Sequence, residues 1–124
     1  MAAAIEPASV ASVAALLRQY RYRAMNEEEL QRGIGQVLSE AGLWFERERR
    51  LGPRDRPDFF LAGGLVIEVK ISGRRTTVAE QLLRYAGHEE VRSILLVTTR
   101  MKHVFLAAEM NGKPVVTVVL GGGV

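Results

Sequence analysis

The sequence contains no cysteine, which excludes disulfide bonds and thiolate zinc sites. It offers no convincing membrane span, because the apolar run at residues 8–17 is too short and is interrupted by serine. The same run lacks the basic start and the cleavage pattern of a secretion signal. Internal repeats and low-complexity domains are also missing. We therefore expect an intracellular, cytoplasmic protein that does not associate with a membrane.

The composition is that of one globular domain. Of the 124 residues, 48% are hydrophobic and 25% are charged, which suits a single folded core. The net charge is +3 and the isoelectric point is about 9.7. A modest positive charge permits binding to a polyanion such as a nucleic acid.

The positions of the arginines are more informative than their number. Five arginines lie shortly before Asp58 and two follow Lys70. Solvated loops would explain either group, but their place on both sides of a charged cluster favours phosphate contacts. The arginines that we predict to contact substrate here are Arg54, Arg56, Arg74 and Arg75.

The hydrophobic periodicity predicts an α/β or α+β protein with a mixed central sheet flanked by helices. The expected helices run from Pro7 or Ser9 to about Tyr22, from an N-cap at Asn26 to Gly42, and over residues 78–87 after a cap at Thr76 or Thr77. The expected strands cover residues 43–51, 58–62, 65–71, 91–99, 104–108 and 115–120, with a hairpin turn at 110–113. Gly33 and Gly35, inside the second helix, suggest a close approach by another backbone or by a nucleic acid.

The most informative residues are Asp58, Glu68 and Lys70. Side chains alternate along a strand, so Glu68 and Lys70 should point to the same side, and a hairpin through residues 62–64 would lay Asp58 beside them. Two carboxylates then converge, as Mg²⁺ requires. A turn cap at Asp58 with an exposed ion pair is the alternative. It is disfavoured because Glu68 lies in an apolar run, where burying a charge is costly. The pattern favours a metal-dependent phosphodiesterase, and specifically a nuclease.

Pro57-Asp58 followed by Glu68-Val69-Lys70, on the second and third strands of a helix–strand–strand–strand–helix–strand core, resembles the PD-(D/E)XK nuclease superfamily. The resemblance covers about residues 26–100. It implies a restriction-endonuclease-like domain over residues 26–120, with a C-terminal β-hairpin. The N-terminal tail and extra helix would then occupy residues 1–25, and a flexible tail residues 121–124.

Two further pairs extend the resemblance. Gln81 and Tyr85, four residues apart on one helix face, are similar to the Gln-x-x-x-Tyr element of RecB-type members. Glu28 and Gln31 are similar to the Glu-x-x-Gln pattern of the VRR-NUC branch, with neighbouring Glu29 as the alternative acidic residue. His88 and His103 lack metal-ligand spacing, and we expect surface or packing positions for them.

The resemblance implies the roles of individual residues. Asp58, Glu68 and the Val69 carbonyl would bind Mg²⁺, with Mn²⁺ able to substitute. Lys70 would orient the attacking water or neutralise charge in the transition state. Gln81 would contact the phosphate or the water, and Glu28 would complete the site. The remaining substrate-binding residues would be Tyr85, Arg84 and Gln31.

The expected activity is Mg²⁺-dependent hydrolysis of phosphodiester bonds in DNA. Cleavage should be structure-selective or end-dependent, because the chain has no room for a separate recognition domain. A homo-oligomer is expected, with a dimer favoured. RNA is the alternative substrate. The alternative function is a catalytically inactive module that binds nucleic acid or a partner on the same fold.

Overall fold

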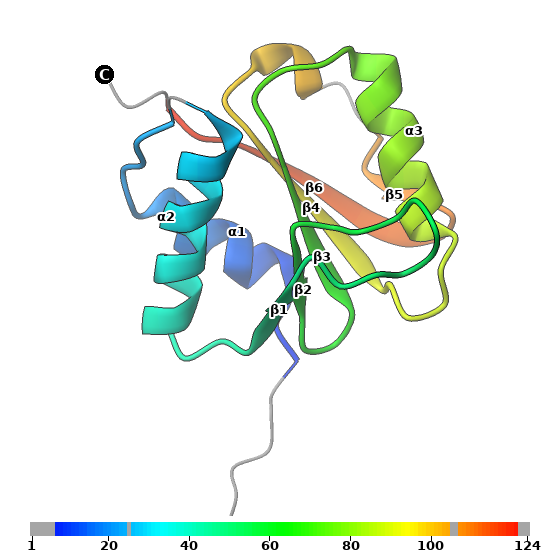
Figure 1. The fold of residues 1–124 in the computed structure, drawn as a ribbon, viewed down its shortest axis with the longest axis horizontal. Helices are drawn as coiled ribbons and strands as arrows, with labels where there is room; N and C mark the ends of the chain where they lie inside the picture. The colour runs from blue at the N-terminus through cyan, green and yellow to red at the C-terminus, as the bar shows by residue number, and fades with distance from the viewer. Residues whose placement is uncertain (1–6, 25, 105–106, 122–124) are drawn as a thin grey trace, which may run out of the picture.

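The computed structural model describes residues 7–24, 26–104 and 107–121 (Figure 1). Within these ranges the chain is α/β, with three α-helices, one 3₁₀ helix and a single open sheet of six strands. The helices are α1 (Val10–Arg18), α2 (Glu27–Glu40), α3 (Arg75–Ala86) and the 3₁₀ helix η1 (Met101–His103). The strands are β1 (Phe45–Arg47), β2 (Phe59–Leu61), β3 (Leu65–Lys70), β4 (Ser93–Thr98), β5 (Glu109–Met110) and β6 (Lys113–Val119).

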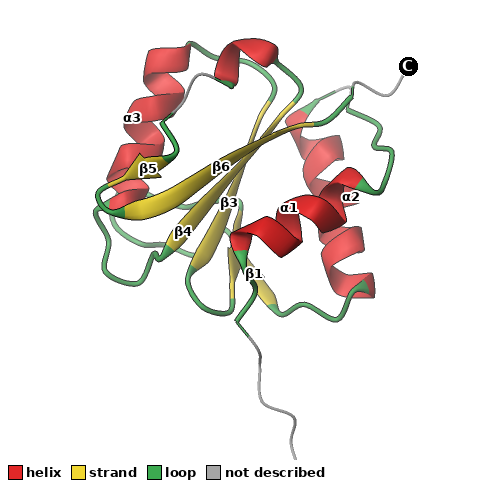
Figure 2. Ribbon diagram, turned by 180° about the vertical axis from the view of Figure 1, so that it is seen from behind, coloured by secondary structure: helices red, strands yellow, loops and turns green. Residues whose placement is uncertain are grey.

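The sheet is mixed and its strand order is β1-β2-β3-β4-β6-β5. Strands β3, β4 and β6 are parallel, whereas β1 and β2 extend the sheet as an antiparallel meander ending on β3. Helices α1 and α2 cover one face of the sheet and α3 covers the other (Figures 1 and 2). The expectation of a mixed sheet flanked by helices is therefore confirmed. No helix among the described residues is both long and apolar enough to cross a membrane.

Strand β3 takes part in both hydrophobic cores because its side chains alternate. Leu65, Ile67 and Val69 pack in the core formed with α1 and α2. Val66 packs on the other face, with α3. Glu68 lies on the same face of the strand as Val66, two residues earlier, so its carboxylate points toward α3.

The first two helices differ in how well the sequence predicted them. Helix α2 begins as expected, because the Asn26 side chain accepts a hydrogen bond from the Glu29 N–H at 2.8 Å. Helix α1 ends at Arg18, four residues before the predicted end at Tyr22. The Tyr22 ring is buried and its hydroxyl donates to the Leu17 carbonyl at 2.9 Å. That bond holds the chain in a turn rather than a further helical turn.

Two other predicted bounds are wrong. The strand expected at residues 43–51 is limited to Phe45–Arg47, because Glu48 has a left-handed φ of 52° that breaks the extended backbone. Helix α3 starts at Arg75, earlier than the expected residue 78. Its N-cap is Arg74, which makes no side-chain capping bond, so neither Thr76 nor Thr77 serves as the cap.

The C-terminal hairpin is confirmed. Asn111 and Gly112 have φ values of 50° and 75°, as a two-residue turn with both central residues left-handed requires. The turn joins β5 to β6. The strand expected at residues 104–108 is not found in its described part, since Val104 caps η1, and residues 105 and 106 lie outside the described ranges. Of the expected tail, residues 122–124 also lie outside them.

The two glycines inside α2 meet neighbours within the chain. A Cβ added at Gly33 would come within 3.0 Å of the Tyr22 ring, so the missing side chain makes room for that ring. A Cβ at Gly35 would lie 3.6 Å from the Phe59 ring, an ordinary van der Waals distance. The close approach at Gly33 is therefore made by Tyr22 of the same chain.

These distances predict different effects for two equivalent substitutions. Gly35→Ala should raise the free energy of unfolding by about 1 kcal/mol, because alanine is the better helix former. Gly33→Ala should gain less or lose stability, because the buried Tyr22 ring must shift. Urea unfolding of both variants and of the wild type measures the difference. Equal stabilisation by both substitutions would contradict the tight packing at Gly33.

Candidate functional site

The carboxylates of Asp58 and Glu68 lie next to each other at one end of the β2–β3 hairpin. Asp58 immediately precedes β2. Phe59 pairs with Ile67, so extending the β2–β3 register by one residue places Asp58 opposite Glu68. The turn at Gly63 and Gly64, both with positive φ, sets this register. The Asp58 N–H donates to Glu68 Oε1 at 3.3 Å.

The structure also brings Lys70 to the pair. The Lys70 Nζ lies 3.4 Å from Glu68 Oε2. The Glu68 side chain is only 4% exposed, whereas that of Lys70 is 24% exposed, so the ammonium lies between the buried carboxylate and solvent. The convergence expected from the alternation of β3 is therefore present, and the ammonium is the accessible part of the group.

The Val69 carbonyl faces the same edge of β3 as the Asp58 carboxylate. The Val69 N–H donates to Asp58 Oδ2 at 2.7 Å, and the N–H and C=O of one strand residue point to the same edge. Continuing the β2–β3 register places Pro57 opposite Val69. Proline has no N–H to donate, so it cannot engage that carbonyl. Two carboxylates and a main-chain oxygen thus occur together.

Gln81 and Tyr85 on α3 form a chain of hydrogen bonds that ends at the Glu68 carboxylate. The Tyr85 hydroxyl donates to Glu68 Oε1 at 3.0 Å, and Gln81 Nε2 donates to the Tyr85 hydroxyl at 2.9 Å. Tyr85 is fully buried, which differs from the substrate contact expected for it. The Gln81–Tyr85 pair holds the Glu68 carboxylate in place.

The acidic residue of α2 that reaches this group is Glu27, whereas we expected Glu28. Glu27 Oε1 accepts a hydrogen bond from the Ile71 N–H at 3.0 Å, directly after Lys70. The Glu28 side chain is 83% exposed and lies 3.4 Å from Arg32 on the same helix. Consecutive residues point in different directions on a helix, so both cannot face the sheet. Glu29 lines a separate cavity on α2.

A periodicity argument could have found Glu27. It precedes Leu30 by three residues and Ile34 by seven, which puts it on the buried face of α2. Gln31 is connected to the site only through Arg47, from which its amide oxygen accepts a hydrogen bond. Arg47 in turn donates from Nε to the Asp58 carbonyl at 3.0 Å.

The predicted substrate-binding arginines divide into two kinds. Arg84 is engaged within the chain, because its Nε donates to Asp55 Oδ1 at 2.9 Å. The others lie on the loops that flank the carboxylates or at the start of α3. These exposed arginines are Arg54, Arg56, Arg74 and Arg75.

The ion pair of Arg84 belongs to a cluster that the sequence analysis missed. Asp55 is buried, and its second oxygen lies 2.8 Å from His88 Nε2. Burial raises the pKa of Asp55, but hydrogen bonds from His88 and Arg84 outweigh burial and lower that pKa below its usual value. The cluster ties the loop before Asp58 to α3. Its members are about thirty residues apart in sequence, and no local pattern signals them.

A second missed cluster holds the loop that follows β3. His103 is fully buried; its Nδ1 lies 2.7 Å from Thr98 Oγ1 and its Nε2 3.2 Å from the Gly73 carbonyl. Arg100 adds a bond from Nε to the Ile71 carbonyl at 2.9 Å. Of the surface and packing positions expected for His103, the structure shows a packing position, and its bonds fix the loop next to Lys70.

Both site carboxyls have raised pKa values. Burial is the largest cause for each, and it raises the pKa of Asp58 to about 6. For Glu68, burial and then repulsion from Asp58 raise the pKa to about 7, against the opposing effect of Lys70. Negative charge is therefore unfavourable here without a further cation.

Among the described residues no group of three or more His, Cys, Asp or Glu side chains is arranged to hold a metal. The candidate donors are instead two carboxylates and the Val69 carbonyl. Oxygen donors of this kind suit Mg²⁺ or Mn²⁺, which keep several water ligands, better than a metal held by protein side chains alone. Searches against protein-family models, curated proteins and solved structures find no match to this chain.

The raised pKa values predict how stability depends on pH. Both carboxyls hold protons more tightly in the folded chain than in the unfolded chain, where their pKa is about 4. Raising the pH from about 4 through 7 therefore removes the stability that these two carboxyls contribute to the folded chain. Glu68→Gln removes one of these groups and should flatten the dependence by at least about 1 kcal/mol between pH 5 and pH 8.

Urea unfolding at the two pH values measures this effect. The matched control is Glu80→Gln, because Glu80 is an exposed glutamate on α3. Its pH dependence should follow the wild type. An unchanged slope in Glu68→Gln would show that Glu68 titrates alike in the folded and unfolded chains.

Proposed function

We propose that this protein is a metal-dependent nuclease of the PD-(D/E)XK type. The observation that carries the proposal is the convergence of Asp58, Glu68 and Lys70 in a polar cluster in which Glu68 is buried and Asp58 and Lys70 are partly exposed. The order α2, β1, β2, β3, α3, β4, with β1–β3 antiparallel and β4 parallel to β3, supports the restriction-endonuclease-like core that the resemblance implies.

Asp58, Glu68 and the Val69 carbonyl would hold the metal, Mg²⁺ or Mn²⁺. Asp58 Oδ1 has no hydrogen-bond or ion-pair partner among the described residues, which leaves it available to a cation. The raised pKa values also favour a divalent cation, because it would offset the repulsion between the two carboxyls. When bound, such an ion polarises the scissile phosphate and lowers the pKa of a water ligand.

The remaining residues of the cluster would position the reacting groups. Lys70 is partly exposed, so its ammonium can reach a phosphate or the attacking water. Tyr85 and Gln81 keep the Glu68 carboxylate oriented from α3. Glu27 holds the main chain directly after Lys70 and adds negative charge near Asp58. Each of these contacts fixes a carboxylate or the lysine before substrate arrives.

The positive charge favours a nucleic-acid substrate, which we propose to be DNA, with RNA as the alternative. The chain carries a net charge of +3, and four exposed arginines lie on loops and a helix start that flank the carboxylates. Cleavage would be structure-selective or end-dependent. Cutting both strands of a duplex or a junction would require a homo-oligomer, with a dimer as the simplest form.

A binding module without catalysis is the second candidate, and one observation favours it. Glu68 already accepts hydrogen bonds from Asp58 and Tyr85 and pairs with Lys70, so this carboxylate is satisfied within the chain. A structural network would look the same. Metal dependence separates the two candidates, because only the nuclease requires the ion for its activity.

The cleavage test uses labelled single-stranded, duplex, flap and four-way-junction DNA with Mg²⁺, Mn²⁺ or EDTA. We expect metal-dependent products from the wild type and a loss of rate of roughly a hundredfold or more in Lys70→Ala. Arg92→Ala removes an exposed charge elsewhere and should cleave like the wild type. Products that persist in EDTA, or that Lys70→Ala forms at the wild-type rate, would exclude this site as their source.

A second test compares two adjacent glutamates. Glu27→Gln should slow cleavage by about tenfold or more, because Glu27 supports the chain after Lys70 and acts on Asp58. Glu28→Gln removes the same charge from the exposed side of α2 and should leave the rate close to wild type. The rates are measured on the best substrate of the panel. A larger loss in Glu28→Gln would assign the supporting role to Glu28 instead.

A further inference from the structure

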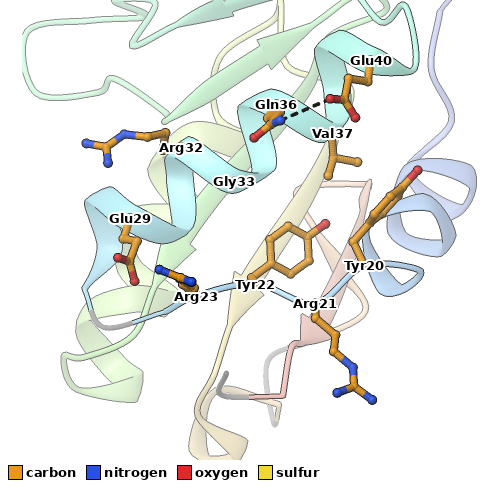
Figure 3. A pocket seen from close by; sticks show the side chains of 10 residues that line it. All are labelled: Tyr20, Arg21, Tyr22, Arg23, Glu29, Arg32, Gly33, Gln36, Val37 and Glu40. Carbon is orange, nitrogen blue, oxygen red and sulfur yellow. Dashed lines mark hydrogen bonds between the residues drawn. The ribbon is translucent and has the colours of Figure 1, made fainter. Parts of the chain in front are cut away.

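A separate cavity of about 460 Å³ lies between α2 and the segment that connects α1 to α2 (Figure 3). None of the residues of the carboxylate cluster lines it. Its volume is within the range of sites that take small ligands or parts of larger ones. The polar lining residues that a ligand would meet on α2 and on the segment before it include Tyr20, Arg23, Glu29, Arg32, Gln36 and Glu40.

Tyr22 gives the cavity a fixed wall. Its ring is 5% exposed and lies against Gly33 of α2, and its hydroxyl is bonded to the Leu17 carbonyl. The neighbouring Tyr20 is 45% exposed. The same short segment therefore anchors one aromatic ring in the protein and presents another to the cavity and solvent.

The charged groups are distributed unevenly along the cavity. Arg23, Arg32 and Glu29 line the end near the start of α2, which leaves that end with a net charge of +1, whereas Tyr20, Gln36 and Glu40 line the end toward the C-terminus of α2 (Figure 3). Across the whole lining, three arginines and two glutamates leave a net charge of +1. A ligand with an anionic part and an aromatic part would match this distribution.

The arginines are available to such a ligand. Arg23 makes no ion pair among the described residues. Arg32 pairs with Glu28 at 3.4 Å, but both side chains are highly exposed, so the pair contributes little and is readily exchanged. Glu40 is occupied by Gln36, whose amide donates to it at 3.2 Å. The Glu40 carboxylate at the end of the cavity near Tyr20 therefore already has a hydrogen-bond donor within the chain.

We propose that this cavity binds a nucleotide unit of a single-stranded nucleic acid. The base would stack on the exposed Tyr20 ring, with the Gln36 amide near its edge, and the phosphate would approach Arg23 and Arg32. An unpaired base exposes the ring face that stacking needs, whereas a base within a duplex does not. The choice of nucleic acid rests on the proposed function, but the binding itself needs neither metal nor cleavage.

The test is fluorescence anisotropy of a short labelled oligothymidylate in EDTA. Tyr20→Ala should weaken binding by about tenfold, because stacking on an aromatic ring is lost, while Tyr20→Phe should retain it. Arg23→Ala should weaken binding several-fold and reduce its dependence on salt concentration. Arg92→Ala, which removes an exposed arginine elsewhere, should do neither.

Two further arms identify the ligand. A duplex of the same length should bind more weakly than the single strand, and Tyr20→Ala should not affect duplex binding. Thymidine 5′-monophosphate should compete with the labelled strand, because the cavity takes one nucleotide unit. Failure to compete would overturn the assignment of the cavity to a single nucleotide.

The inference is overturned if Tyr20→Ala binds the strand as tightly as the wild type. It is also overturned if Arg92→Ala weakens binding as much as Arg23→Ala does, because binding is then diffuse electrostatic attraction. The proposed cleavage is judged separately. Lys70→Ala should abolish cleavage and keep this binding, whereas Tyr20→Ala should keep the chemistry on a saturating substrate.

Discussion

A carboxylate buried within an apolar strand is the constraint on which the candidate site depends. Glu68 lies between Ile67 and Val69 in β3, at 3% exposure, where an unpaired charge would be costly. Its partners therefore have to be supplied by the fold. The Asp58 N–H supplies a partner from the residue just before β2, the Tyr85 hydroxyl from α3, and the Lys70 ammonium from β3 itself.

The position of β3 in the sheet makes this arrangement possible. It is the strand at which the antiparallel meander meets the parallel half of the sheet, so elements from both parts converge on it. Glu27 of α2 contacts the main chain directly after the end of β3, and Tyr85 of α3 contacts Glu68 on the face of β3 that α3 covers. The cluster is thus a property of three packed elements. Its raised pKa values follow from burial and from the closeness of two acids, and they make a cation the natural complement.

Much of the site could be predicted because it depends on local rules. Alternation along a strand placed Glu68 and Lys70 together, and the glycine turn placed Asp58 opposite Glu68. Spacing on a helix put Gln81 and Tyr85 on one face. The motif match predicts Glu28, but the hydrophobic period of α2 places Glu27 on the face toward the sheet, and Glu27 is the residue that makes the contact. The strand at 43–51 was overextended because alternation does not reveal the left-handed backbone at Glu48.

The sequence by itself specifies the features that depend on neighbouring residues only. These are the hydrophobic periods of the strands and helices, the Asn26 cap and the Asn111-Gly112 turn. The clamps of Asp55 with His88 and of His103 with Gly73 join residues about thirty positions apart, and they exist only once the sheet and helices have packed. The same holds for the cavity beside Tyr20, which requires Tyr22 to lodge against Gly33. Burial and long-range pairing depend on which elements become neighbours, and a one-dimensional pattern carries that information only weakly.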